Sequence, residues 1–190
     1  MKTTSIMIVG VGGQGSLLAS KLLGRLLVDE GYDVKVSEVH GMSQRGGSVV
    51  TYVRYGERVY SPIIAEGEAD IIISFEKLEA ARYAKYLKKG GRIIVNTQEI
   101  DPMPVIIGTA SYPDNCLDEL TTKGLAVETL DALTPAEQAG SSKAVNIVLM
   151  GRAAKYFDIP HDSWIKAIET TVAERFVEMN KKAFELGYNS

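Results

Sequence analysis

A glycine-rich segment near the start of the chain constrains the fold more than any other feature. Residues Gly10 to Gly15 read Gly-Val-Gly-Gly-Gln-Gly and lie between an apolar run at 5–10 and an amphipathic pattern at 15–31. The apolar run predicts a strand, and leucines spaced four residues apart after the glycines predict a helix with one buried face. A strand, a glycine loop and a helix in this order begin the repeating unit of an α/β protein.

The rest of the chain continues the alternation of strands and helices. Apolar runs predict further strands at 33–39, 48–55, 70–74, 92–96, 103–108 and 125–130, with a short antiparallel return at 58–60. Helical patterns occupy 75–87, 145–156, a segment from about 134, and the C-terminal residues. No linker or repeat divides the chain, so residues 1–190 are expected to form a single domain. We therefore expect an α/β, three-layer Rossmann-like fold, with a mainly parallel sheet, helices on both faces and a helical C-terminal third.

Composition and charge exclude several classes of partner. Hydrophobic residues make up 45% of the 190 residues and charged residues 24%, with a formal net charge of −3. No cluster of Lys and Arg provides the basic stripe of a nucleic-acid-binding protein, so no nucleic acid is expected as a partner. No apolar run is long enough to cross a membrane, and no signal-peptide pattern precedes the first strand. We expect a cytoplasmic protein with no membrane partner.

Metal-ligating residues are scarce in this chain. Cys116 is the only cysteine, and His40 and His161 are the only histidines. Because an iron–sulfur cluster is held by about four thiolates, this chain cannot hold a cluster alone. The spacings typical of zinc ligands are also absent from the sequence, so we expect no metal site.

The glycine loop itself allows three interpretations. Glycines let a backbone approach a phosphate closely, and the following helix N-terminus offers free N–H groups, which suits a phosphate-bearing ligand. The same pattern occurs in NAD and FAD sites, but those expect an acidic residue about 20 positions later, at the end of the second strand. Here Glu38 follows Gly10 by 28 positions. The third interpretation is that the glycines only permit close packing of the strand and the helix.

A second polar loop, His40 to Gly47, follows the predicted strand at 33–39. In a parallel sheet its position places it at the same carboxyl edge as the glycine loop, where open α/β sheets bind ligands. His40, Ser43 and Gln44 are hydrogen-bonding residues, and Arg45 can bind a carboxylate or phosphate with two parallel hydrogen bonds. The alternative is an ordinary solvated loop.

Two polar residues at helix positions have both a structural and a functional interpretation. Glu76 begins a predicted helix, where a carboxylate stabilises the N-terminus, and it also lies at the carboxyl edge. Asn146, in an otherwise apolar helix, is either a satisfied buried amide or a residue that faces the same crevice. His40 and Glu76 could pair as acid and base, but no spacing requires it, and catalytic residues stay unassigned.

Three segments together resemble a known family. The Gly10–Gly15 loop, the block Glu38–Gly47 and the block Ser74–Ala80 are similar to segments of the gamma subunit or gamma domain of 2-oxoacid:ferredoxin oxidoreductases. The beta subunit of the indolepyruvate type gives the best match, and the resemblance covers nearly the whole chain. The two later blocks are much more specific than the glycine loop, which many unrelated α/β proteins share.

The resemblance implies a function that needs a second chain. Enzymes of this family convert a 2-oxoacid and coenzyme A to an acyl-CoA and carbon dioxide, and pass the electrons to ferredoxin. The resemblance implies that thiamine diphosphate, Mg²⁺ and [4Fe-4S] clusters belong to a large partner subunit in a hetero-oligomer, and that this chain alone binds no cofactor and is inactive. It also implies that the small subunit completes the enzyme and forms part of the site for coenzyme A or substrate. The candidate binding residues are Gly10, Gly12, Gly13, Gln14, Gly15, His40, Ser43, Gln44, Arg45 and Glu76.

Two alternatives from other classes stay open at this point. One is a standalone nicotinamide-dependent oxidoreductase built on the glycine loop. The other is a non-catalytic interaction module that never touches a substrate. Within the resembling family, a pyruvate or 2-oxoglutarate enzyme is the alternative to the indolepyruvate type, because this chain does not reveal which side chain the 2-oxoacid carries.

Overall fold

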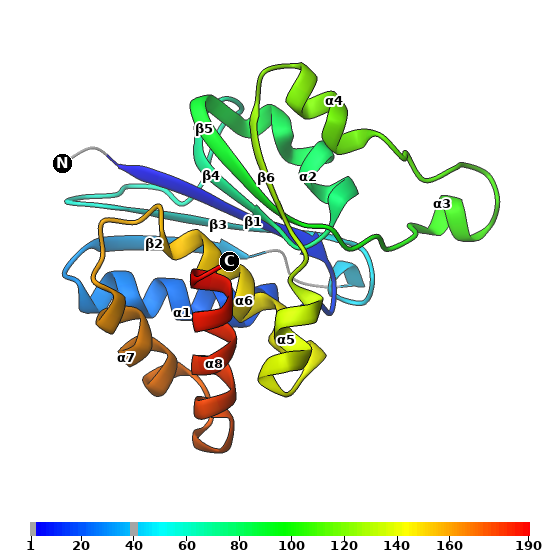
Figure 1. Ribbon diagram of the computed structural model, residues 1–190. Coiled ribbons are helices and arrows are strands. Elements are labelled where there is room, and N and C mark those ends of the chain that lie inside the picture. Colours follow the sequence, from blue (N-terminus) through cyan, green and yellow to red (C-terminus); the bar gives the residue numbers. More distant parts are fainter. Residues whose placement is uncertain (1–2, 39–41) are drawn as a thin grey trace.

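The computed structural model describes residues 3–38 and 42–190, which fold around one six-stranded sheet (Figure 1). The strand order across the sheet is β2-β3-β1-β4-β5-β6. The strands are β1 (Thr4–Val11), β2 (Asp33–Glu38), β3 (Ser48–Gly56), β4 (Ala69–Ser74), β5 (Leu87–Asn96) and β6 (Ala126–Leu130).

All strands except β3 run in the same direction. Strand β1 pairs in parallel with β4, β4 with β5, and β5 with β6. Strand β3 is antiparallel to both of its neighbours, β1 and β2, so β2 also runs parallel to β1. This topology confirms the expected mainly parallel sheet. It also brings the ends of five strands and the start of β3 to one carboxyl edge.

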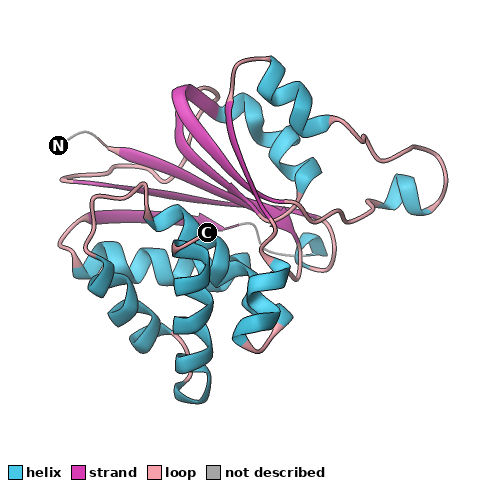
Figure 2. Ribbon diagram, viewed as in Figure 1, coloured by secondary structure: helices cyan, strands magenta, loops and turns pink. Residues whose placement is uncertain are grey.

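Helices cover both faces of the sheet, which confirms the three-layer arrangement (Figure 2). Helices α2 and α4 lie on one face, and α1, α5, α6, α7 and α8 lie on the other. The α-helices are α1 (Ser16–Asp29), α2 (Lys77–Tyr83), α3 (Met103–Ile106), α4 (Cys116–Thr122), α5 (Leu133–Ala139), α6 (Val145–Ala154), α7 (His161–Thr171) and α8 (Val177–Tyr188). The C-terminal third is helical, as expected.

Strand β1 contributes to both hydrophobic cores, because its side chains alternate between the two faces of the sheet. Ile6 and Ile8 pack with α1, α6 and α8, whereas Met7 and Val9 pack in the smaller core beneath α2. All four side chains are fully buried. Burial of this kind stabilises the fold by roughly 1.5–3 kcal/mol per side chain.

Glycines at the contact between helices α6 and α8 let the two backbones approach each other closely. An ideal Cβ at Gly151 would lie 2.2 Å from the carbonyl oxygen of Phe184, and one at Gly187 would lie 2.0 Å from that of Val148. Helix α6 is buried almost all round. This confirms the prediction of a buried helix at 145–156.

Several predicted elements differ in the structure. The strand expected at 103–108 is wrong: α3 forms there, because Pro102 and Pro104 cannot donate to a strand ladder but are compatible with a first helical turn. The helix expected at 75–87 ends at Tyr83, and a 3₁₀ turn then leads directly into β5 at Leu87. Residues 58–60 form no strand. Helix α4 was not predicted at all.

The segment between β5 and α4, residues 97–115, is named here the arm. Figure 1 shows it projecting from the carboxyl edge, with α3 at its outer part. Met103, Ile106 and Ile107 on this arm are 63–65% exposed. The arm therefore presents apolar side chains to solvent rather than contributing them to either core.

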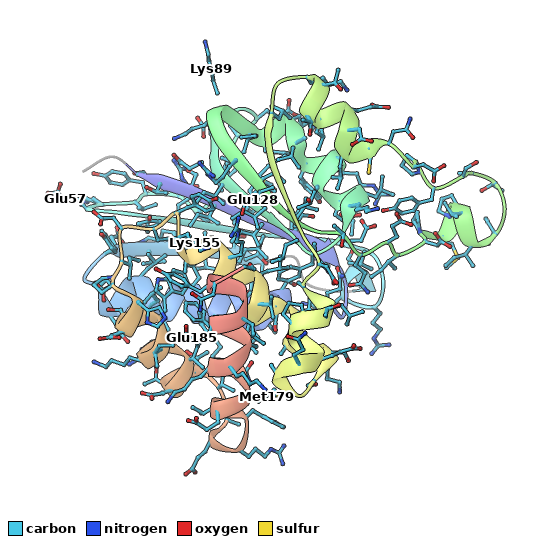
Figure 3. The ribbon with its side chains drawn as sticks, viewed as in Figure 1. Glu57, Lys89, Glu128, Lys155, Met179 and Glu185 are labelled. Carbon is cyan, nitrogen blue, oxygen red and sulfur yellow. The ribbon has the colours of Figure 1, made fainter. Side chains whose placement is uncertain are left out.

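An ion-pair network joins strand β6, at the border of the sheet, to the C-terminal residues. Arg152 donates hydrogen bonds to Glu128 of β6 and to the carbonyl oxygen of Ser190, and Lys155 donates to the same carbonyl at 3.0 Å. Figure 3 labels Glu128 and Lys155 in this region.

Among the described residues, no helix is both long and apolar enough to span a bilayer.

Candidate functional site

The glycine loop between β1 and α1 lies directly against the second loop. The amide of Gly12 donates a hydrogen bond of 2.8 Å to the carbonyl oxygen of Gly47. An ideal Cβ at position 12 would lie 2.2 Å from the carbonyl oxygen of Ser43 and 2.6 Å from that of Gln44. Glycine at position 12 therefore lets one loop rest on the other, and the expected meeting of the two loops at the carboxyl edge is confirmed.

Gly13 and Gly15 have positive φ angles of +103° and +86°, a region that disfavours residues with a side chain. At Gly15 the space for a Cβ is occupied by the amide of Asn146, which donates a hydrogen bond of 3.1 Å to the Gly15 carbonyl. The Asn146 amide is thus a satisfied buried group that ties α6 to the start of α1. Gly13 instead faces open space, with nothing within 4 Å of an ideal Cβ.

The side chain of Gln14 holds the ends of three strands together. Its Oε1 accepts a hydrogen bond of 2.7 Å from the amide of Val11, and its Nε2 donates at 2.9 Å to the carbonyl of Phe75. The same nitrogen donates at 3.1 Å to Gln98, after β5. Gly10 allows this arrangement, since a Cβ there would lie 2.9 Å from Gln14 Oε1. Gln14 therefore organises the edge of the sheet.

The second loop folds as a short 3₁₀ turn, Met42–Gln44, followed by Arg45 and two glycines. The amide of Gly47 donates at 2.9 Å to the carbonyl of Ser43, which closes the turn. Gly46 has a φ of +95°, and nothing lies within 4 Å of its ideal Cβ. These contacts place the backbone of 43–47 beside the glycine loop.

The side chains of Gln44 and Arg45 are exposed at the outer surface of this loop. Because Gly46 follows Arg45 directly, the backbone of Arg45 lies at the same edge as the two loops. His40 lies outside the described residues, so the structure does not test its predicted role.

Glu76 is fully buried and forms the N-cap of α2, accepting a hydrogen bond of 2.9 Å from the amide of Glu79. Its Oε1 also accepts hydrogen bonds from the amide of Ile100, at 3.3 Å, and from the hydroxyl of Tyr112. Burial and the bond to Glu76 raise the pKa of the Tyr112 phenol. Glu76 thus combines the expected helix-stabilising role with a second one, because it holds both ends of the arm.

A polar cluster beside these loops escaped the sequence analysis. The hydroxyl of Ser48 donates a hydrogen bond to Glu79, and Arg82 Nη1 donates to the other oxygen of Glu79 at 2.7 Å. The hydroxyl of Tyr83 lies 3.4 Å from that of Ser48. The spacing of Glu79 and Arg82 on one helix turn was visible in the sequence, but only the fold brings Ser48 to them.

The carboxyl group of Glu79 is an unusual one because its side chain is only 2% exposed. Burial raises its pKa, and the hydrogen bond from Ser48 and the charge of Arg82 only partly oppose this effect. Perturbed carboxyl groups of this kind gather at functional sites more often than elsewhere.

A cleft of about 250 Å³ opens at the carboxyl edge, where these features meet. Its walls come from the two loops, from α2 and from the outgoing segment of the arm, residues 100–104. The lining residues are Val11, Gly46, Gly47, Ser48, Leu78, Glu79, Arg82, Ile100, Asp101, Pro102, Met103 and Pro104. The edge of the sheet that the sequence indicated therefore contains a hollow with a polar and an apolar wall.

Comparison with known proteins places this chain in a family. Residues 5–190 match the family model described as pyruvate ferredoxin/flavodoxin oxidoreductase. The chain belongs to this family. Its sequence is 44% identical to that of "Indolepyruvate oxidoreductase subunit IorB" of Thermococcus kodakarensis, over 98% of this chain and 95% of that protein.

Solved structures of this oxidoreductase family share the fold. The gamma subunit of a keto/oxoacid ferredoxin oxidoreductase from Geobacter sulfurreducens superimposes with a TM-score of 0.72 at 23% identity, covering 98% of this chain and 96% of that one. The 2-oxoglutarate:ferredoxin oxidoreductase of Magnetococcus marinus gives a TM-score of 0.72 at 16% identity. All of this chain matches 31% of that larger chain, whose structure contains 2-oxoglutarate, coenzyme A and succinyl-CoA.

The geometry of this family member does not fit a nicotinamide site. In dinucleotide-binding folds the pyrophosphate approaches the glycines, and an acidic residue at the end of the second strand binds the ribose. Here the backbone of Ser43 lies against Gly12. Strand β3 separates β1 from β2, and Glu38 at the end of β2 accepts a hydrogen bond from Ser20.

One cysteine cannot supply the roughly four thiolates that hold an iron–sulfur cluster. Cys116, the sole cysteine, is buried. Within residues 3–38 and 42–190, no three His, Cys, Asp or Glu side chains are grouped so that they could hold a metal ion.

Proposed function

We propose that this chain is the small subunit of an indolepyruvate-type 2-oxoacid:ferredoxin oxidoreductase, and that residues 1–190 act as one gamma-type domain. The observation that carries the proposal is the 44% identity to an indolepyruvate oxidoreductase subunit over nearly the full length of both proteins. Family membership over residues 5–190 supports the same assignment.

The proposal divides the work of the enzyme between two chains. A large partner subunit holds thiamine diphosphate with Mg²⁺ and the [4Fe-4S] clusters, and passes electrons to ferredoxin. The small subunit supplies shape and hydrogen-bonding groups, which is the usual contribution of protein around such cofactors. The single cysteine supports this division, because about four thiolates are needed for one cluster.

The small subunit contributes its carboxyl edge as one wall of the coenzyme A and substrate site. Three observations support this part of the proposal. The two predicted loops meet at that edge, Gly13 faces open space there, and the guanidinium group of Arg45 is exposed. A guanidinium group and free backbone N–H groups are suitable partners for the phosphates of coenzyme A.

Anaerobic co-expression with the candidate large subunit tests the proposal. The two chains should copurify, and the pair should reduce ferredoxin or a dye only when indolepyruvate and coenzyme A are both present. The small chain alone should be inactive. Rates with pyruvate and 2-oxoglutarate in the same assay distinguish the substrate type. Activity of the small chain alone, or failure of the two chains to associate, would contradict the proposed function.

A further inference from the structure

The cleft at the carboxyl edge combines two chemically different walls. One wall comprises Ser48, Glu79 and Arg82, and the other is the outgoing segment of the arm, residues 100–104, which is apolar except at Asp101. Ligand sites commonly pair an apolar wall with a small number of fixed polar groups. The two walls therefore indicate the chemistry of a ligand.

The polar wall presents a positioned cation. The Arg82 side chain is 43% exposed and uses Nη1 to bond Glu79, which is 2% exposed beneath it. Glu79 accepts bonds at both of its oxygens, from Ser48 and from Arg82. A guanidinium group has five N–H donors in a planar fork, so one bond to Glu79 fixes its orientation and leaves other donors for a ligand.

The apolar wall is stiff and uncovered. Pro102 and Pro104 flank Met103, which is 65% exposed although it lines the cleft. Proline restricts the backbone, and the bonds that Glu76 makes to both ends of the arm hold this wall in place. The thioether of methionine makes favourable contacts with aromatic rings.

We propose that this cleft binds an aromatic anion, with its ring against Met103 and Pro104 and its carboxylate or phosphate on Arg82. The inference rests on the proposed function, which supplies two sources of this chemistry: the indole and carboxylate of an arylpyruvate, or the adenine and phosphates of coenzyme A. The volume of about 250 Å³ lies below the roughly 300–1,000 Å³ of complete ligand pockets. The cleft therefore receives one end of a ligand, and the partner subunit holds the remainder.

Three charged side chains line the cleft, Glu79, Arg82 and Asp101, and of these only Arg82 can donate hydrogen bonds to an anion. Asp101 also lines the cleft, but it is exposed to solvent, which weakens its field. The carboxylate of Glu79 is buried behind Arg82, and its two oxygens accept hydrogen bonds from Ser48 and Arg82. Arg82 is thus the charged group of this cleft with donors left for a ligand.

Steady-state kinetics of the reconstituted pair test the inference with two independent variants. Arg82→Gln should raise one KM about tenfold or more with little change in kcat, since a charge-assisted hydrogen bond of that strength is lost. Arg82→Lys should recover part of the affinity. Met103→Ser, at an exposed position that does not support the core, should raise the same KM. Arg25→Gln, on the solvent side of α1, is the matched control.

The two ligand sources give different results. A rise confined to the KM of coenzyme A assigns the cleft to its phosphoadenosine end, whereas a rise confined to the KM of indolepyruvate assigns it to the substrate. Unchanged KM values for both ligands in a pair that assembles and turns over would overturn the inference while leaving the proposed function intact. An inactive or unassembled wild-type pair would instead contradict the proposed function. In parallel, adenosine 3′,5′-bisphosphate and phenylpyruvate serve as binding probes of the wild-type pair by ligand-observed NMR.

Discussion

The hydroxyl of Tyr112 donates a hydrogen bond to the buried carboxylate of Glu76, across 36 positions of sequence. The amide of Ile100 donates to the same oxygen at 3.3 Å. One side chain, at the N-cap of α2, therefore closes the arm, since both its outgoing and its returning segments donate hydrogen bonds to Glu76. The hydroxyl of Tyr112 also accepts a bond of 3.1 Å from the amide of Leu78.

Replacing Tyr112 by Phe should loosen the arm. The change removes one donor from a buried carboxylate and one acceptor from the amide of Leu78, and lost bonds to charged groups cost about 1.5–3 kcal/mol. We expect a lower free energy of unfolding in urea and faster hydrogen exchange confined to the arm and the first turn of α2. Tyr60→Phe is the matched control, because Tyr60 is 83% exposed. Equal exchange in the arm of the Tyr112 variant and the wild type would contradict the clamp.

Gly12→Ala should separate the two loops at the carboxyl edge. The new Cβ would meet the backbone of Ser43 and Gln44 at 2.2–2.6 Å, and a backbone cannot move aside as a flexible side chain can. Overpacking of this kind costs roughly 1–3 kcal/mol, which a thermal melt would register as a lower Tm.

Gly24→Ala is the matched control, and we expect it to raise the thermal stability that Gly12→Ala lowers. Gly24 lies inside α1, and an ideal Cβ there would make an ordinary contact of 3.6 Å with Val36. Alanine in a helix interior is more favourable than glycine by roughly 0.5–1 kcal/mol, so this variant should melt at a higher temperature. A Gly12→Ala variant as stable as Gly24→Ala would show that the loops are not packed as described.

Local patterns predicted the parts of the fold that depend on near neighbours in sequence. The glycine loop, its strand and its helix follow from periodicity, and so does the buried helix at 145–156. The arm was misread because Ile106 and Ile107 are apolar, although the neighbouring prolines do not suit a strand and the isoleucines face solvent. Burial depends on tertiary context, which a single sequence window does not contain.

The sequence predicted where the candidate site lies on the sheet, but not all of the residues that form it. The two loops were placed at the carboxyl edge because parallel strands end together. Ser48, Glu79 and Arg82 were missed because their contacts join β3 to α2 across 31 positions, through a pairing of β3 with β1 that runs antiparallel. The second role of Glu76 was missed for a similar reason, since its partners Ile100 and Tyr112 lie far along the chain.

The raised pKa of Glu79 predicts a specific dependence of stability on pH. An acid whose pKa is higher in the folded protein than its ordinary value near 4.5 binds its proton more tightly when folded. Glu79 therefore contributes stability that is fully present below about pH 4.5 and is lost as pH rises through its folded pKa. The free energy of unfolding of the wild type minus that of Glu79→Gln should fall over this interval and then stay level.

Urea unfolding of both proteins at several pH values between about 4 and 8 measures this difference. Glu119→Gln removes a surface carboxylate of α4 and controls for the change in net charge. A difference that rises with pH would mean that Arg82 and Ser48 stabilise the charged form of Glu79 by more than burial opposes it. The polar wall of the cleft would then rest on a conventional ion pair.

Arg45→Ala should weaken binding of coenzyme A by the reconstituted oxidoreductase. Arg45 is exposed and follows a 3₁₀ turn. The backbone of this turn packs against Gly12, so the backbone position of Arg45 is fixed. If it contacts a phosphate, its removal raises the KM for coenzyme A and leaves kcat and assembly unchanged, because the interaction is the same in the ground and transition states.

The rise in the KM for coenzyme A should shrink at high salt, since exposed charges are screened there. Arg25→Ala, which removes another exposed arginine, paired with Asp29 on α1, should leave the KM at its wild-type value. An unchanged KM in the Arg45 variant would remove this residue from the coenzyme A wall, and a loss of copurification with the large subunit would assign it to the subunit interface instead.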